Sequence, residues 1–141
     1  GGIEVSVEAL TVELNAAVGY TWSDIKKFPD ATVIGNEAPL ISRYTYNLGA
    51  QFTPELGGNM EGLFRLDYRR TGKTWWEPYN TTVRKPVDLV DVRAGVKGEA
   101  WSLTGFATNL FNKKYNAEFS PGGFVFKARP RIYGLEATYT F

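Results

Sequence analysis

The sequence contains no cysteine and no histidine. Without cysteine the chain has no disulfide, no thiolate zinc site and no cysteine nucleophile. Without histidine it lacks the commonest metal ligand and the commonest general base. Chemistry would have to rest on carboxylate, lysine, tyrosine and hydroxyl groups. We therefore expect a protein that is not an enzyme and that needs no cofactor and no metal ion.

The sequence also lacks an excess of charge and long hydrophobic runs. Its 16 Lys and Arg residues nearly balance its 15 Asp and Glu residues, whereas a nucleic-acid-binding surface is usually strongly basic. Its longest apolar runs have three or four residues, as at 16–18, far fewer than the roughly 20 residues of a transmembrane helix. We expect no nucleic-acid partner. A membrane β-barrel is compatible with this pattern, because its strands lack long apolar runs too.

What the sequence does contain is alternation with a period of two. Successive side chains of a strand point to opposite faces of the sheet, so apolar residues at every second position indicate a strand with one apolar face. The alternating segments occupy residues 3–9, 12–22, 44–52, 64–69, 90–97, 101–109 and 133–141. The sixth alternates least cleanly, with Leu103 on one face and Phe106 on the other. We predict an all-β chain of about seven strands.

The connections between these segments are alternately short and long. Short turns are expected at 10–11, 54–59 and 98–99. The second and third of these contain Gly, Asn or Pro, which favour hairpins. Long connections are expected at about 23–42, 76–86 and 113–129. Strict alternation places the short turns at one end of the sheet and the long connections at the other. This is the geometry of an antiparallel up-and-down meander.

Aromatic residues gather near the ends of the expected strands. In an outer-membrane barrel such rings form girdles at the two membrane interfaces, whereas in a soluble β-domain they would pack in the core. The residues concerned are Tyr20, Trp22, Tyr44, Tyr46, Phe52, Tyr68, Trp75, Trp76, Trp101, Tyr133, Tyr139 and Phe141. The pattern alone leaves both interpretations open.

The number of strands constrains the membrane interpretation. Closed barrels of single bacterial chains have an even number of strands, at least about eight. Seven strands would leave two edges with unpaired backbone groups, which lipid cannot satisfy. In a membrane, the chain would therefore be part of a larger barrel. Its last strand ends on the short-turn side, which faces the periplasm in bacterial barrels, so the long connections would be extracellular.

The C-terminal part of the sequence resembles the end of TonB-dependent outer-membrane receptors. Trp101-Ser102-Leu103, followed by NLFNKKY at 109–115, matches a W-x-L … N-L-x-[DN]-K-x-Y stretch of that family. PRIYGL at 130–135 and YTF at 139–141 resemble its closing strand and terminal aromatic residue. YTYNLGAQF at 44–52, LDY at 66–68 and GK at 72–73 resemble the preceding hairpin. The resemblance extends from about residue 40 to the end, and more loosely from Ile3.

This resemblance implies a transmembrane barrel of about 22 strands with an N-terminal plug, located in the bacterial outer membrane. Such receptors actively import scarce nutrients, for example ferric siderophores, and are driven by the TonB complex of the inner membrane. Residues 1–141 would be the C-terminal part of the barrel domain, with no plug or TonB-contacting segment among them. Implied partners are the rest of the barrel and the plug, outer-membrane lipid, the TonB complex through the missing N-terminal region, and the outer-membrane assembly machinery. For that machinery Phe141 would be the signal.

Two groups of residues are candidates for a functional site. The first consists of charges on the polar face of the fourth and fifth segments: Arg65, Asp67, Arg69, Asp91, Arg93 and Lys97. In a lumen they could line a ligand path or hold a plug by charge-assisted hydrogen bonds, or form cross-strand pairs that neutralise one another. The second consists of aromatic residues of the long connections that could contact a ligand: Trp76, Tyr79, Phe119 and Phe124. Alternatively, Trp75 belongs to the girdle and Trp76 packs the base of its loop.

Two other functions are compatible with the same pattern. A porin-like passive channel of the outer membrane would have the same alternation without a plug. A soluble β-barrel domain would turn its apolar face inward and bind a small ligand there. The identity of any transported substrate does not follow from the sequence.

Overall fold

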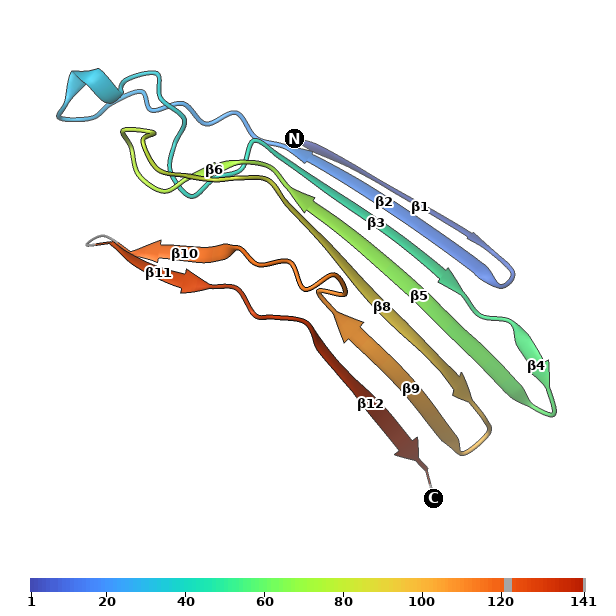
Figure 1. Ribbon diagram of the computed structural model, residues 1–141. Helices are drawn as coiled ribbons and strands as arrows, with labels where there is room; N and C mark the ends of the chain where they lie inside the picture. Colours follow the sequence, from blue (N-terminus) through green and yellow to red (C-terminus); the bar gives the residue numbers. More distant parts are fainter. Residues whose placement is uncertain (121–122, 141) are drawn as a thin grey trace.

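Seven successive strands form one antiparallel sheet in the computed structural model, which describes residues 1–120 and 123–140 (Figure 1). Each strand pairs with the strands before and after it in the sheet, as the alternation of short and long connections predicts. The strands are β1 (Gly2–Ala9), β2 (Val12–Tyr20), β3 (Tyr44–Phe52), β5 (Met60–Thr71), β8 (Val87–Lys97), β9 (Trp101–Thr108) and β12 (Ile132–Tyr139). The short β4 (Glu55–Gly57) pairs with the beginning of β5. The all-β meander is confirmed.

The long connections lie together at one end of the sheet, and the short turns lie at the other end (Figure 1). We call residues 21–43, 72–86 and 109–131 the first, second and third long connections. The first contains a 3₁₀ turn at Ala31–Val33. The second contains the strand pair β6 (Thr74–Trp75) and β7 (Val83–Arg84), and the third contains the pair β10 (Asn116–Ser120) and β11 (Phe124–Lys127). These two strand pairs were not predicted.

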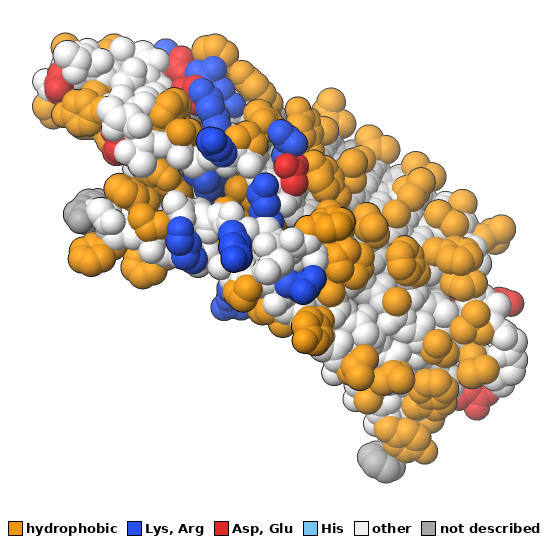
Figure 2. Space-filling model, in the orientation of Figure 1, with side chains coloured by type: hydrophobic (Ala, Val, Ile, Leu, Met, Phe, Trp, Pro, Cys, Tyr) orange, Lys and Arg blue, Asp and Glu red, His pale blue; other side chains and the backbone are white. Residues whose placement is uncertain are grey.

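The register of the ladder gathers the apolar side chains of all seven strands on one face. One row of directly opposed residues runs Val7, Leu14, Ala50, Leu66, Val92, Ala107 and Tyr133. Because side chains alternate, a slip of one residue would exchange the two faces, and the continuous row shows that no slip occurs between neighbouring strands. Figure 2 shows hydrophobic side chains spread over the whole length of the strands.

No second layer formed by the described residues covers this apolar face. Leu14, Leu48 and Leu135 are 50%, 49% and 77% exposed, and Val33, Trp76 and Val87 are the buried hydrophobic residues among those described. Uncovered apolar area of this extent is unfavourable in water and suits the wall of a membrane barrel. No helix in the described part of the chain is long and apolar enough to span a membrane.

Aromatic rings border the apolar face at both ends, as interfacial girdles require. At the end of the long connections these are Tyr20, Tyr44, Tyr46, Tyr68 and Tyr133, and at the short-turn end Phe52, Phe64, Trp101 and Tyr139. Three of the predicted girdle residues lie elsewhere. Strand β2 ends before Trp22, whose ring lies 4.7 Å from the guanidinium of Arg43, and Trp75 and Trp76 belong to the second long connection. Phe141 lies outside the described residues.

At the end of the long connections, strands β5 and β8 extend beyond the segments that alternation predicts, because the pattern inverts there. Arg70 and Asp88 are directly opposed on the apolar face, while Val87 lies on the polar one. The two charges form an ion pair of 2.9 Å, and the Tyr68 hydroxyl donates a hydrogen bond of 2.6 Å to the same Asp88 oxygen. Pairing makes the two charges acceptable beside the aromatic girdle. Alternation is assessed within one segment, so it cannot predict an ion pair between two strands.

The assignment of faces predicts different costs for neighbouring substitutions in β3. Leu48 lies on the apolar face and Asn47 on the polar face. We expect Leu48→Arg to destabilise the full-length barrel by about 2–4 kcal/mol, because the new charge would enter hydrocarbon near mid-depth. We expect Asn47→Arg to reduce the stability of the barrel much less, because its charge would lie on the polar face. Urea unfolding of the barrel in lipid vesicles measures both, and equal losses of stability would contradict the assignment.

Candidate functional site

The first and second long connections pack against each other at the end of β3 and β5. Ser42 and Thr74 form an isolated bridge, and the Leu40 amide donates a hydrogen bond of 2.7 Å to the Trp75 carbonyl. The Asn36 side-chain amide donates 3.0 Å to the Pro78 carbonyl. These contacts join segments about forty residues apart into one surface, which we call the loop cap.

Glu37 is the centre of the loop cap. Its carboxylate lies 2.7 Å from the Lys73 ammonium and 3.4 Å from the Arg43 guanidinium, and its side chain is 14% exposed. The Asn80 side chain accepts a hydrogen bond from the Glu37 amide and donates one to its carbonyl, both 2.9 Å. Burial raises the pKa of Glu37, but the hydrogen bond and charge of Lys73 and the charge of Arg43 outweigh it, so the pKa lies below its usual value.

A second carboxylate shapes the tip of the second connection. Glu77 accepts hydrogen bonds from the amides of Tyr79, Thr81 and Thr82 at 2.6–2.9 Å. Burial raises the pKa of Glu77, and these amide hydrogen bonds lower it further than burial raises it. The turn presents Tyr79, which is 52% exposed and meets the Phe28 ring edge to face at 6.4 Å.

The four aromatic residues expected to contact a ligand do not form a single platform. Trp76 is 9% exposed, and its ring lies 6.1 Å from that of Phe119 and 5.7 Å from the Arg84 guanidinium. Tyr79 stands on the loop cap, while Phe124 on β11 is 70% exposed. The contact of Trp76 with Phe119 links the second and third connections. Phe28, the partner of Tyr79, was not singled out in the sequence.

Asn109 closes the base of the third connection. Its amide hydrogen bonds Asp91 (2.7 Å), and its side chain donates to the carbonyls of Lys113 (3.0 Å) and Arg129 (3.2 Å). The side-chain oxygen accepts from the Lys113 amide at 2.7 Å. Asn109 is buried, with a φ of 49°, a left-handed conformation that asparagine tolerates better than most residues. The asparagine of the NLFNKKY stretch therefore ties the outgoing and returning backbone together.

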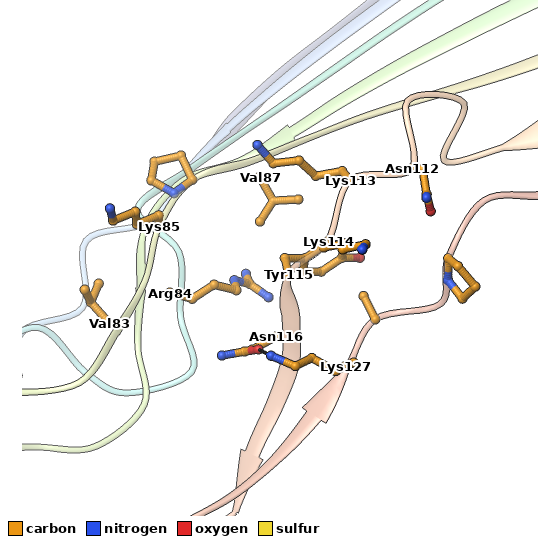
Figure 3. A pocket seen from close by; sticks show the side chains of 13 residues that line it. Val83, Arg84, Lys85, Val87, Asn112, Lys113, Lys114, Tyr115, Asn116 and Lys127 are labelled. Atoms are coloured by element: carbon orange, nitrogen blue, oxygen red, sulfur yellow. Dashed lines mark hydrogen bonds between the residues drawn. The ribbon is translucent and has the colours of Figure 1, made fainter.

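A cleft of about 730 Å³ lies between the second and third connections. We call it the cationic cleft, because five Lys or Arg residues and no acidic residue line it: Arg84, Lys85, Lys113, Lys114 and Lys127. Figure 3 shows Arg84 extending from one wall toward the strand that carries Tyr115 on the other wall, with the hydrogen bond between Asn116 and Lys127 below them. The sequence analysis missed this site, because its lysines come from distant segments.

The predicted lumen charges do lie together on the polar face of β5 and β8, but two of the opposed pairs carry like charges. Arg65 faces Arg93, and Asp67 faces Asp91. The expected neutralisation by directly opposed residues is therefore wrong for these two pairs, whereas Lys97 faces the opposite charge of Glu61. Arg65 instead binds Asp67 of its own strand through two hydrogen bonds of 2.8 Å. Directly opposed like charges repel. The ion pair of Arg65 with Asp67 on the same strand, and that of Arg93 with Glu136 on β12, offset this repulsion.

The side chain of one lumen charge, Arg93, reaches beyond the strand pair of β5 and β8. Arg93 extends over β9 to Glu136 at 3.4 Å, and its guanidinium lies 5.9 Å from the Phe106 ring. A Cβ at Gly134 would lie 2.9 Å from that ring, so glycine leaves room for it. Arg69 and Lys97 are exposed and form no ion pair with any residue that the structure describes. Within those residues no group of three or more acidic side chains could hold a metal ion.

The chain is similar in sequence and in fold to known outer-membrane receptors. A family model described as TonB dependent receptor-like, beta-barrel, matches residues 2–110. The ferrichrome outer membrane transporter and phage receptor of Escherichia coli K12 is 27% identical over 150 residues, covering 99% of this chain and 20% of that protein.

Solved structures share the fold. The ferric preacinetobactin receptor BauA of Acinetobacter baumannii matches 98% of this chain with a TM-score of 0.83 and 22% identity. The ferric yersiniabactin uptake receptor FyuA of Yersinia pestis matches 99% with a TM-score of 0.83 and 16% identity. This chain covers 21% and 23% of those two chains. It therefore spans about a fifth of the length of the relatives that it matches.

The lowered pKa of Glu37 predicts that the loop cap opens in acid. A carboxylate with a depressed pKa adds stability that is complete above its ordinary pKa, about 4.3, and is lost as the pH falls through the folded-state value. We expect hydrogen-exchange protection of the Ala38 and Leu40 amides in the full-length protein to fall below about pH 4. Glu37→Gln should lower the hydrogen-exchange protection of these amides at neutral pH and remove its pH dependence. Persistent pH dependence in this variant would contradict the assignment, and Glu118→Gln is the control.

The hydrogen bonds of Asn109 predict a local loss of stability on its removal. Asn109→Ala leaves two carbonyls and one amide without partners and places alanine at a positive φ. We expect local opening of the third connection to become easier by about 1–3 kcal/mol. Hydrogen exchange of residues 113–120 measures it. Asn112→Ala is the matched control, because Asn112 also has a positive φ and accepts one hydrogen bond, from the Arg131 amide. Equal effects would refute the special role of Asn109.

Proposed function

The chain belongs to the TonB-dependent receptor family, within its β-barrel domain, and from this premise we propose that its parent protein takes up a ferric siderophore across the bacterial outer membrane. The observation that carries the proposal is the family match over residues 2–110. The names of the relatives support the substrate class, since they are a ferrichrome transporter and receptors for ferric preacinetobactin and ferric yersiniabactin. The family consists of transport receptors, and we propose that this member has no enzymatic activity.

We propose that residues 1–141 form the C-terminal part of the barrel wall, roughly strands 16 to 22 of about 22. The two edge strands, β1 and β12, support this proposal, because their outer backbone groups need partners in lipid. The remainder of the barrel, the plug and the TonB-contacting segment would come from the rest of the parent chain. We propose Phe141 as the signal for the outer-membrane assembly machinery.

The lumen charges are proposed to hold the plug. Arg69 and Lys97 support this role, because both are exposed and neither forms an ion pair with a described residue. Exposed cations on a lumen wall can receive carboxylates from a domain inside the barrel. The like-charged pairs Arg65–Arg93 and Asp67–Asp91 support it further, because a plug with complementary charges would relieve their repulsion. On the extracellular side, Tyr79 and Phe124 offer exposed rings for contact with a chelate, next to the covered pair Trp76 and Phe119.

Energy-dependent uptake tests the proposal. The full-length protein is expressed in an iron-starved strain that lacks its own siderophore receptors, and the cells are supplied with radioactive iron in a panel of siderophores. We expect uptake of at least one ferric siderophore, and we expect an uncoupler of the proton gradient to abolish it. Uptake that continues after uncoupling would identify a passive channel and refute the proposal, as would failure with every chelate.

The same assay tests the exposed rings. Tyr79→Ala and Phe124→Ala should raise the siderophore concentration needed for half-maximal uptake, because each removes a stacking surface. Phe111→Ala is the matched control, since this exposed ring lies at the base of the third connection. Equal effects of the three substitutions would remove the special role of the loop tips.

A further inference from the structure

The cationic cleft borders the polar face of the sheet, at the end where the long connections begin. Val87, which lines the cleft, is buried and directly opposed to Thr71 on the polar side. The lumen charge Arg69 lies on the same face, opposed to Leu89 two residues further along β8. The cleft therefore lies between the long connections and the surface that we assign to the lumen, on the side away from the apolar face.

The positive charges of the cleft are not neutralised. None of its five cations forms an ion pair with a carboxylate among the residues that the structure describes. Lys127 donates a hydrogen bond of 2.8 Å to the neutral Asn116. Lys113 acts electrostatically on Asp88, but Asp88 is already paired with Arg70 at 2.9 Å. Cations that share one cleft repel one another, and an anion bound among them would relieve this repulsion.

Arg84 is the member of the cleft whose position is fixed. Its guanidinium lies 5.7 Å from the ring of Trp76, which is 9% exposed. One of its terminal nitrogens donates a hydrogen bond of 3.0 Å to the buried hydroxyl of Thr74. A guanidinium held in this way loses little conformational freedom when it binds a ligand. Its planar set of donors suits carboxylate and similar groups with two oxygen atoms.

The size of the cleft suits an organic molecule. Its volume of about 730 Å³ lies within the range of about 300–1,000 Å³ that is usual for small-molecule sites. Tyr115 adds a ring, and Val83 and Pro86 add apolar surface to the lining. Figure 3 shows the side chains of Arg84 and Lys113 extending from opposite walls into the space between the connections. A ligand that carries several negative oxygen atoms could contact both walls at once.

We propose that the cationic cleft selects the charge of the transported chelate: it binds anionic ferric siderophores, with carboxylate or catecholate oxygen atoms, in preference to neutral ones. This inference rests on the proposed function, because it names the charge class of the same cargo. A small chelate is favoured over an acidic segment of the plug, because the cleft is formed mainly by the long connections. These lie on the side from which an imported chelate arrives.

Two iron complexes of equal shape and different charge test the proposal. Both chelators have the same tripodal amine scaffold. The ferric tris-catecholate is anionic, and the ferric tris-hydroxypyridinonate is neutral. Equilibrium dialysis with radioactive iron measures their binding to the purified full-length receptor in a neutral detergent. We expect the anionic complex to bind about tenfold more tightly or better. Equal binding, tighter binding of the neutral complex, or binding of neither would overturn the proposal.

Substitution of two lysines assigns this preference to the cleft. Lys113→Gln/Lys114→Gln should weaken binding of the anionic complex about tenfold or more, and that of the neutral complex less than about twofold. Lys113→Arg/Lys114→Arg, which keeps both charges, should retain most of the binding. Equal losses for both complexes would indicate a merely structural effect and overturn the proposal. If the glutamine variant does not fold, as judged by heat-modifiable gel mobility, Lys127→Gln takes its place with the same expectation.

The matched control removes the same charge elsewhere. Lys26 and Lys27 are adjacent exposed lysines of the first connection and do not line the cleft, so Lys26→Gln/Lys27→Gln should leave binding of the anionic complex unchanged. An equal loss in this variant would reduce the preference to the net charge of the receptor and overturn the proposal. Unchanged binding in the Lys113/Lys114 variant, together with a plug that becomes sensitive to protease, would assign the cleft to the plug instead.

Two further comparisons separate the alternatives. Inorganic phosphate should displace the anionic complex no better than sodium chloride of equal ionic strength, and stronger displacement would assign the cleft to a soluble inorganic anion. Dialysis requires no transport, so its result is separate from that of the uptake experiment. Uptake of neutral chelates alone would leave the proposed function intact and overturn this inference. Binding of the anionic complex without uptake of any chelate would contradict the proposed function alone.

Discussion

The pairing of backbone groups in a single unbroken register is the constraint on which the rest of the structure depends. In lipid each unpaired amide or carbonyl is costly, so the ladder from β1 to β12 must be continuous. Continuity in turn determines which side chains share a face. The row from Val7 to Tyr133 is apolar because every strand keeps the same phase, and the opposite row carries the lumen charges. The position of every side chain in the wall follows from this one ladder.

The sequence sufficed to predict the wall, because the information needed for it is local. Alternation in each segment identifies strand and face, and Gly, Pro and Asn identify the turns. Prediction stopped short where the structure depends on pairs of segments. Toward the long connections, β5 and β8 extend as far as the pair of Arg70 and Asp88. Like charges are opposed because register, not composition, decides which residues face each other.

The functional surfaces were less accessible to sequence analysis for the same reason. Glu37 joins Lys73 and Arg43 across two connections, and the cationic cleft combines lysines separated by the whole of β8 and β9. Exposed aromatic residues could be recognised as candidates, but their grouping could not. Trp76 is covered by Phe119, which comes from a segment more than forty residues away. The family resemblance supplied the architecture and left these contacts undetermined.

The closure of the third connection by Asn109 has a consequence for how such receptors diversify. Its side chain binds backbone atoms of Lys113 and Arg129, and backbone atoms are the same whatever side chains accompany them. The chain between those two residues can therefore change in length and composition without disturbing the strands below. Asn109 thus separates the strands of the wall from the variable surface above them. Residues 114–128 are therefore a natural place for inserting new binding segments.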